Sequence, residues 1–252
     1  MLDLLFLSIL FLLWGSFLNV VGHRLLKDVS IIRPRSHCPL CKHTLAWYDL
    51  IPVISYFSLR GKCRYCKASI SLLYPIIEAI TALALTSLFI LVPSHFIPAY
   101  LFFFSALIIS IRTDLELMLI SRLFTLCLIP IGVLFAATSM LPITPFDSIL
   151  GAACGYGFLW LMANAFLLIT GKHGMGQGDL ELLAFIGSFI GVFGIWATLL
   201  LSTIIGSLIG LLYIKLARQS HTVKIPFGPF LALGAMLYVL FEPYITAFLI
   251  PG

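Results

Sequence analysis

Two aspartates stand out in a chain that carries few charged residues. Asp114 and Asp179 each lie where a long apolar run meets a polar segment. Two carboxyl groups held a few ångströms apart cannot both ionise, so such a pair shares one proton. The ionised member can then act as general base on water while the protonated member polarises a peptide carbonyl. The pair is a candidate for aspartic peptide hydrolysis; the alternative is two interfacial acids neutralised by Arg112, Arg122 and Lys172.

A glycine-rich stretch directly precedes the second aspartate. Residues 174–179 read Gly-Met-Gly-Gln-Gly-Asp, with glycines at alternate positions. Glycine allows another backbone to come close and permits positive φ, which favours a docking edge for an extended peptide beside Asp179. No strand precedes the run, so it is not a dinucleotide-binding loop. For the neighbouring acids Glu116 and Glu181, we favour plain neutralisation by nearby cations over a catalytic role.

A second candidate site consists of four cysteines in two Cys-x-x-Cys pairs separated by 21 residues. Two such pairs can aim four thiolates at one tetrahedral Zn²⁺. Disulfides or a redox pair are the alternatives, and a reducing cytoplasmic setting disfavours disulfides. The surrounding segment is too small to fold on a core of its own, so the metal would supply folding energy. The proposed ligands are Cys38, Cys41, Cys63 and Cys66.

The elements that must position these residues are membrane helices. The chain of 252 residues is 61% hydrophobic and 10% charged, whereas soluble domains carry about 25% charged residues. Roughly 20 apolar residues cross the ~30 Å hydrocarbon layer as a helix. The apolar runs are continuous and not alternating, which argues against a β-barrel. We therefore predict an all-α, polytopic membrane protein whose first run is a retained span with its N-terminus outside, not a cleaved signal peptide.

Eight spans are predicted from the apolar runs. The third and sixth are the shortest: fifteen residues reach only about 22 Å, so either these helices run on past the acids or the membrane is thin there. Only Gly194 separates the sixth and seventh, and one long buried segment is the alternative. The spans are Leu4–Val21, Leu72–Val92, Ile97–Ile111, Leu123–Met140, Ser148–Thr170, Leu180–Phe193, Ile195–Ile214 and Phe227–Ile250.

The distribution of basic residues orients these spans. With eight spans, all fifteen Lys and Arg residues fall on one side, which the positive-inside rule makes cytoplasmic. The net charge of +5 is then explained by the membrane orientation and by contact with anionic lipid, and no nucleic-acid partner is expected. Nine of these cations lie in the first loop. The others are Arg112, Arg122, Lys172, Lys215, Arg218 and Lys224.

This topology divides the chain into three regions. Residues 1–22 form the first transmembrane helix, 23–71 the cytoplasmic four-cysteine segment, and 72–252 a seven-helix membrane domain that carries the protease site. The connections on the opposite side are short, so function faces the cytoplasm.

Several ordered motifs along nearly the whole chain resemble the type IV prepilin peptidase family. Besides the cysteine pairs, they are Gly15–Val21, Asp49–Val53, Ile70–Pro75 followed by Glu78, Thr113–Leu115, Gly174–Asp179 and Ile225–Pro229. The resemblance implies that Asp114 and Asp179 are the catalytic pair and that the four cysteines bind zinc. It also implies cleavage of prepilin or pseudopilin leaders after glycine, at the cytoplasmic face of the bacterial inner membrane. Many members then methylate the new N-terminus with S-adenosylmethionine.

Four positions depart from this family pattern. The usual Pro-Asp after the first catalytic aspartate reads Ser121-Arg122 here, and Glu181 stands where a Lys is common. His173 replaces a frequent acidic residue. Glu181 changes the charge beside the pair, which leaves a catalytically altered homologue acting in pilus or secretion assembly as an alternative. An ion-coupled transporter is a weaker alternative, because the acids cluster at one face and no inverted repeat is evident.

Overall fold

The computed structural model describes all residues except 1, 26, 28, 173, 218–225 and 250–252. The described part is helical and contains no β-strand beyond two isolated bridges. It forms two compact units, Met1–Ile90 and Leu91–Gly252, each of which is described by itself. The features predicted at His173, Arg218, Lys224, Ile225 and Ile250 lie outside the described residues.

The first unit holds two long apolar helices and the segment between them. These helices are α1 (Leu2–Leu25) and α3 (Leu73–Leu91), and two short ones lie between them, η1 (Trp47–Leu50) and α2 (Ile54–Ser58). A Cβ atom on Gly15 would lie 2.9 Å from Cβ of Thr81, so the backbone of α1 lies directly against α3. The rings of Phe11 and Phe89 extend this contact with centroids 5.3 Å apart.

The second unit packs its helices around a phenylalanine core. Phe103 of α4 stacks on Phe189 of α7 with ring centroids 4.7 Å apart, and it also contacts Phe185 at 5.4 Å. All three side chains are fully buried. In chain order the elements are η2 (Ser94–Phe96), α4 (Ile97–Leu117), η3 (Arg122–Phe124), η4 (Leu126–Leu128), α5 (Ile129–Ala137), α6 (Pro145–Thr170), α7 (Gln177–Ala217) and α8 (Gly228–Leu249).

Glycines bring α6 and α7 into backbone contact. A Cβ atom on Gly151 would lie 2.2 Å from the carbonyl oxygen of Gly187, and one on Gly187 would lie 2.3 Å from that of Gly151. Gly155, one turn along α6, faces the carbonyl oxygen of Leu183 in the same way. Small residues spaced by four let membrane helices approach closely where no hydrophobic force drives their association. This contact fixes the first part of α7, which begins next to Asp179.

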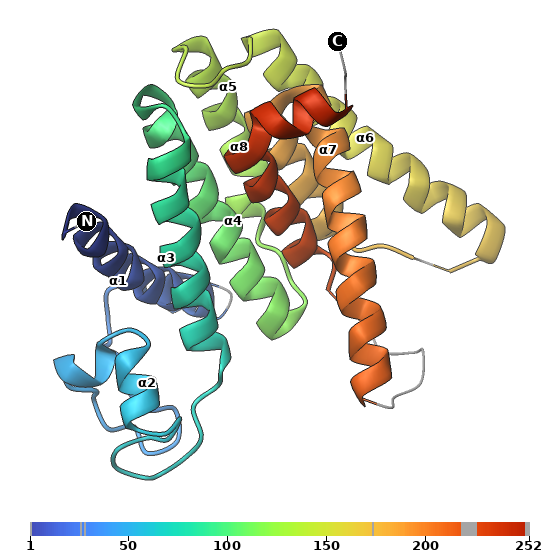
Figure 1. The fold of residues 1–252 in the computed structure, drawn as a ribbon. Coiled ribbons are helices and arrows are strands. Elements are labelled where there is room, and N and C mark those ends of the chain that lie inside the picture. The colour runs from blue at the N-terminus through green and yellow to red at the C-terminus, as the bar shows by residue number, and fades with distance from the viewer. Residues whose placement is uncertain (1, 26, 28, 173, 218–225, 250–252) are drawn as a thin grey trace. The chain divides into compact units, whose positions relative to one another are not determined.

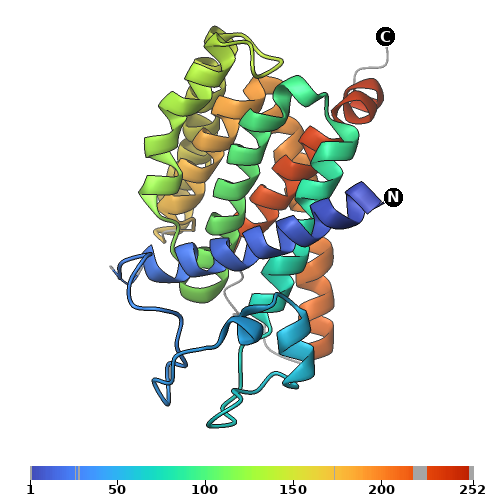
Figure 2. The same ribbon diagram turned by 90° about the vertical axis from the view of Figure 1, so that its left-hand side faces the viewer.

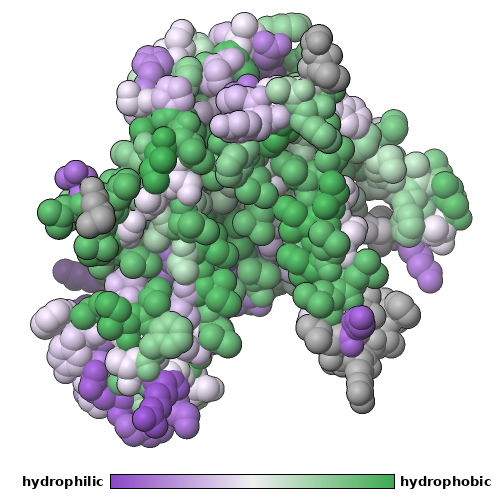
Figure 3. Space-filling view, in the orientation of Figure 1, coloured by the Kyte–Doolittle hydropathy of each residue, from purple (hydrophilic) through white to green (hydrophobic). Residues whose placement is uncertain are grey.

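The membrane-protein class is confirmed, whereas the count of eight spans is not. Six helices in the described part are long and apolar enough to cross a membrane. The predicted fourth span, Leu123–Met140, instead consists of two 3-10 turns and the nine-residue α5. Hydrophobic side chains cover the helices of the second unit, and hydrophilic ones gather over the segment between α1 and α3 (Figure 3).

The predicted sixth and seventh spans are the two parts of α7. The helix is broken at Gly191, not at Gly194, with φ 71° and ψ −175°, a conformation open essentially to glycine alone. A Cβ atom on Gly187 would lie 2.8 Å from Cδ1 of Ile195, although eight residues along a straight helix span about 12 Å. The chain therefore folds back at Gly191, and α7 is drawn as two stretches in different directions (Figures 1 and 2).

The length of α4 decides between the two explanations given for the short third span. The helix does not stop at Ile111 but continues to Leu117, which gives it 21 residues. Asp114 and Glu116 therefore belong to the last turns of a full-length membrane helix. No thinning of the membrane is needed at this helix.

Candidate active site

Asp114 lies near the C-terminal end of α4, where a negative charge is unfavourable. Its side chain is 6% exposed. The helix ends three residues later, at Leu117, and the next residue, Met118, adopts φ 52° and donates its backbone N–H to the Asp114 carbonyl at 2.9 Å. A carboxylate is disfavoured at a helix C-terminus. The N-terminus of α8 compensates, because the backbone amide of Gly228, its first residue, lies against the Asp114 carboxyl group.

Asp179 lies in the first turn of α7, where a negative charge is favourable. It is the third residue of that helix, and its carboxyl group accepts from the backbone amide of Gly176 just before the helix. An acid at this position that reaches back to the capping residue is one half of a capping box, and the helix dipole favours its charge. Each aspartate is thus held at the N-terminus of a helix.

The structure brings the two aspartates together. The Asp114 carboxylate interacts electrostatically with Asp179. Ile120 packs against the glycines beside both acids: a Cβ atom on Gly178 would lie 3.0 Å from Cβ of Ile120, and one on Gly228 would lie 2.9 Å from its Cδ1. Oδ2 of Asp114 is buried and makes no hydrogen bond of good geometry to any described residue. A polar buried oxygen of this kind is suited to a water molecule or a substrate group.

The other two acids of this region are neutralised, as predicted. Arg112 Nη1 lies 2.6 Å from Glu116 Oε2 within α4, and Arg122 Nε lies 3.1 Å from Glu181 Oε1. Among the residues that the structure describes, no salt bridge involves Asp114 or Asp179. Within the described part of the chain, Arg112 and Arg122 therefore pair with the glutamates and not with the aspartates.

The glycine run before Asp179 is used for close packing and not for positive φ. The described glycines with positive φ are Gly61, Gly171 and Gly191, none of which belongs to the run. A Cβ atom on Gly174 would lie 2.4 Å from the ring of Phe166. A Cβ atom on Gly176 would meet only Asp179, whose Oδ2 would be 3.6 Å away. Gly176 is therefore the open position of the run, directly beside the carboxylate.

The four predicted metal ligands come together in the first unit. The sulfur atoms of Cys38, Cys41, Cys63 and Cys66 all lie within 4.8 Å of one another, and none of these cysteines forms a disulfide. Zn–S bonds of about 2.3 Å in a tetrahedron separate sulfur atoms by about 3.8 Å. The Cys38 and Cys66 sulfurs are 3.7 Å apart, so the donor set fits a zinc ion.

Two matching turns present these thiolates. Lys42 donates its backbone N–H to the Cys38 carbonyl at 2.9 Å, and Lys67 donates to the Cys63 carbonyl at 3.0 Å. Both lysines have positive φ, 59° and 61°, so the two Cys-x-x-Cys pairs fold alike. Backbone N–H groups of Cys41 and Leu40 point at Cys38 Sγ and lower the pKa of that thiol to about 6. The turn thus favours the thiolate that a metal requires.

Glu78 has a structural role that the sequence did not indicate. Its buried carboxylate accepts the backbone N–H of Val53 at 2.8 Å. Val53 has φ 60° and ψ −52°, a strained conformation for a β-branched residue. Ser16 also bonds to this carboxylate, so Glu78 connects α1, α3 and the loop before α2. Only the motif Ile70–Pro75 with its following acid pointed to this position.

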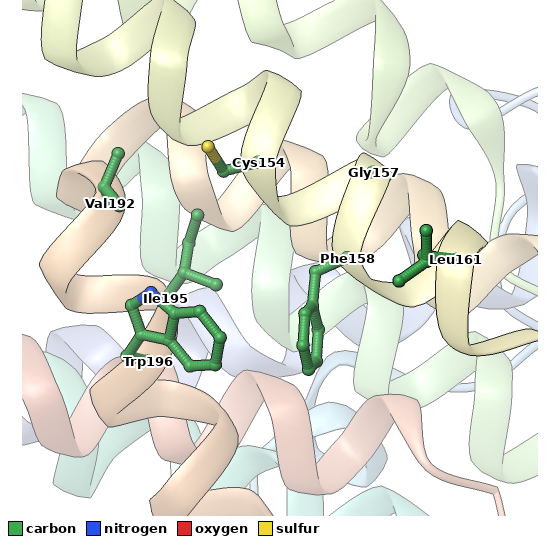
Figure 4. A pocket seen from close by; sticks show the side chains of 7 residues that line it. All are labelled: Cys154, Gly157, Phe158, Leu161, Val192, Ile195 and Trp196. Carbon is green, nitrogen blue, oxygen red and sulfur yellow. The ribbon is translucent and has the colours of Figure 1, made fainter.

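A pocket of about 340 Å³ lies between α6 and α7, apart from these sites (Figure 4). Phe158 and Trp196, with ring centroids 5.0 Å apart, form one side of it, and Cys154 and Leu161 are also part of its lining. The lining carries no ionisable group other than the Cys154 thiol. The pocket suits an apolar chain and offers no catalytic chemistry.

Comparisons with known proteins agree along nearly the whole chain. The Bacterial Peptidase A24 N-terminal domain matches residues 9–92, and the Type IV leader peptidase family matches residues 101–214. A protein of Bacillus subtilis (strain 168) is 38% identical over 97% of this chain and 98% of its own length. One of Aeromonas salmonicida (strain A449) is 35% identical over 96% and 93%. Both are called prepilin leader peptidase/N-methyltransferase, and no solved structure matches the chain.

These matches confirm the resemblance noted in the sequence and the enzyme class expected from it. They also cover both regions with candidate sites, because the four cysteines fall in the first match and both aspartates in the second. The chain belongs to the type IV leader peptidase family.

Proposed function

We propose that this protein removes the leader peptide of type IV prepilins or pseudopilins by aspartic peptide hydrolysis at Asp114 and Asp179. The observation that carries the proposal is the meeting of these two carboxyl groups at two helix N-termini, with no cation of the described residues paired to either. Two acids so placed are suited to hold a single shared proton.

The dyad would divide the chemistry between its members. The ionised carboxylate takes a proton from a water molecule as the oxygen attacks the scissile carbonyl, and the protonated carboxyl group donates to the carbonyl oxygen. Collapse of the tetrahedral intermediate breaks the C–N bond, and the leaving nitrogen takes up a proton from the dyad. The buried Asp114 Oδ2, which has no hydrogen bond of good geometry to a described residue, is a position from which a carboxyl group could hold this water or carbonyl.

We further propose that the dyad works at the cytoplasmic face of the bacterial inner membrane. The basic residues of the sequence lie together in the predicted topology, and cytoplasmic loops carry such an excess. Substrates with an apolar helix and a basic leader would then lie in the membrane with the leader on the same side. Cleavage after glycine follows the family pattern.

A second reaction, N-methylation of the newly exposed amino terminus, rests on the names of the relatives. S-adenosylmethionine would supply the electrophilic methyl group. For the first unit we propose a structural zinc ion held by Cys38, Cys41, Cys63 and Cys66, since the donor set fits.

The dyad is tested by Asp114→Asn and Asp179→Asn, each co-expressed with a prepilin of the host. Loss of one proton-transfer group should lower the rate of leader removal by roughly 10²–10⁴-fold. Amides are nearly isosteric with the acids, so the abundance of both variants in the membrane should remain normal. Mass spectrometry of the processed pilin scores leader loss and methylation separately. Cleavage at the wild-type rate by either variant would exclude the dyad.

A further inference from the structure

Arg122 and Glu181 form an ion pair next to the candidate dyad. Arg122 Nε donates to Glu181 Oε1 at 3.1 Å. The Glu181 side chain is 2% exposed, whereas that of Arg122 is 65% exposed. A buried carboxylate requires a partner, and removal of the arginine would leave its charge uncompensated. This pair therefore constrains the two segments that it joins.

The two segments are those that carry the aspartates. Arg122 opens η3, eight residues after Asp114, and Glu181 lies in α7 two residues after Asp179. Between Asp114 and Arg122, the chain leaves α4 at Met118 and places Ile120 against the glycines beside both acids. The ion pair therefore links the end of this connection, at Arg122, to Glu181 of α7.

The pair acts on the dyad only indirectly. Residues two apart on a helix do not face each other, so Glu181 points away from Asp179 around α7. Among the described residues, neither member of the pair forms a salt bridge with an aspartate. Arg122 and Glu181 are therefore positioning residues and not catalytic ones.

We propose that the Arg122–Glu181 ion pair is a clamp that sets the position of Asp179 relative to Asp114. The inference rests on the proposed function of this dyad and assigns a role to two further residues.

The test is charge reversal, with Arg122→Asp, Glu181→Lys and the double variant. Each single change places like charges together, and kcat for leader removal should fall on the order of tenfold or more with a smaller change in KM, because misplaced catalytic groups slow chemistry more than binding. The double variant restores opposite charges and should recover most of kcat. Lys215→Gln, an exposed charge change near the other end of α7, is the matched control and should behave like wild type.

Thermal unfolding in detergent shows whether each variant folds, and Glu181→Gln, which keeps the shape of the side chain, replaces any single variant that does not. Wild-type kcat in the single variants overturns the clamp, as does a double variant no faster than the slower single one. If these results accompany inactive Asp→Asn variants, the clamp fails while the proposed function stands. A wild-type protein that cleaves no prepilin overturns the proposed function and the clamp with it.

Discussion

Each aspartate depends on the backbone amide of a glycine at a helix N-terminus, so in both cases a glycine is in direct contact with an acid. Asp114 lies at the unfavourable end of α4 and is compensated by the start of α8 at Gly228. Asp179 is compensated within its own helix, through Gly176. The acids themselves were evident in the sequence, since few others lie at the ends of apolar runs. The amide partner of Asp114 was not, because it lies 114 residues further along the chain.

Gly228→Ala tests this contact. The new Cβ atom would lie 2.6 Å from Asp114 Oδ2 and 2.9 Å from Cδ1 of Ile120, so the carboxyl group must move. A displacement approaching 1 Å at a catalytic group costs on the order of 100-fold in rate. We expect kcat for leader removal to fall by about this factor, as measured with purified enzyme and a synthetic prepilin.

Gly157→Ala is the matched control, because a Cβ atom at this position in α6 meets nothing within 4 Å. Alanine favours a helix by about 0.5–1 kcal/mol over glycine, so this variant should be active and no less stable than wild type. Equal activity of the two alanine variants would show that Gly228 does not position Asp114.

The breaks between elements were harder to predict than the elements. The apolar runs predicted eight spans, and the six membrane-length helices of the described part lie on seven of these runs, because burial and lipid both require continuous apolar sequence. They did not predict the position of the break in α7, since glycines at 187, 191 and 194 are equally permissive by type. Packing determines which glycine breaks the helix. Gly187 lies against Gly151 within the helix, and Gly191 adopts the non-helical conformation. The 3-10 turns before α5 could not be predicted either, because the run in which they lie is almost uniformly apolar.

The paired turns of the four-cysteine segment were predictable because ligand type and spacing determine them. Zinc binding by this segment is tested by measuring the zinc content of the purified wild-type protein and of the Cys63→Ser variant. Cys63 is the buried cysteine of the second pair. We expect a single zinc ion per wild-type chain by elemental mass spectrometry and much less in the variant, because a hydroxyl group binds Zn²⁺ weakly compared with a thiolate.

Cys154→Ser is the control, since Cys154 lies alone and exposed on α6 and should leave the zinc content unchanged. Metal-free wild-type protein, or a Cys63→Ser variant with full zinc content, would contradict the assignment. Proteolysis of the segment 26–72 in both variants would show further whether the metal supplies its folding energy.

At the scale of the whole molecule, the membrane orientation is predicted from charge, with α6 as the reference helix. This helix has 26 residues and is about 39 Å long, more than the ~30 Å of hydrocarbon that a membrane-spanning helix crosses. We therefore expect residues just before Pro145 and just after Thr170 to lie on opposite sides of the membrane. Lys172 follows the helix, and the segment 138–144 before it carries no basic residue. The positive-inside rule then predicts that Lys172, and the start of α7 with Asp179, face the cytoplasm.

Ser139→Cys and Lys172→Cys test this orientation, because both positions are exposed and lie in the connections on either side of α6. A membrane-impermeant maleimide added to intact spheroplasts should label Ser139→Cys well above the wild-type background. Lys172→Cys should react only after the membrane is opened, because its connection is predicted to face the cytoplasm. The wild-type chain, with its six native cysteines, supplies the background for both. Labelling of Lys172→Cys in intact spheroplasts would place the dyad on the outer side, where a basic leader held in the cytoplasm could not reach it.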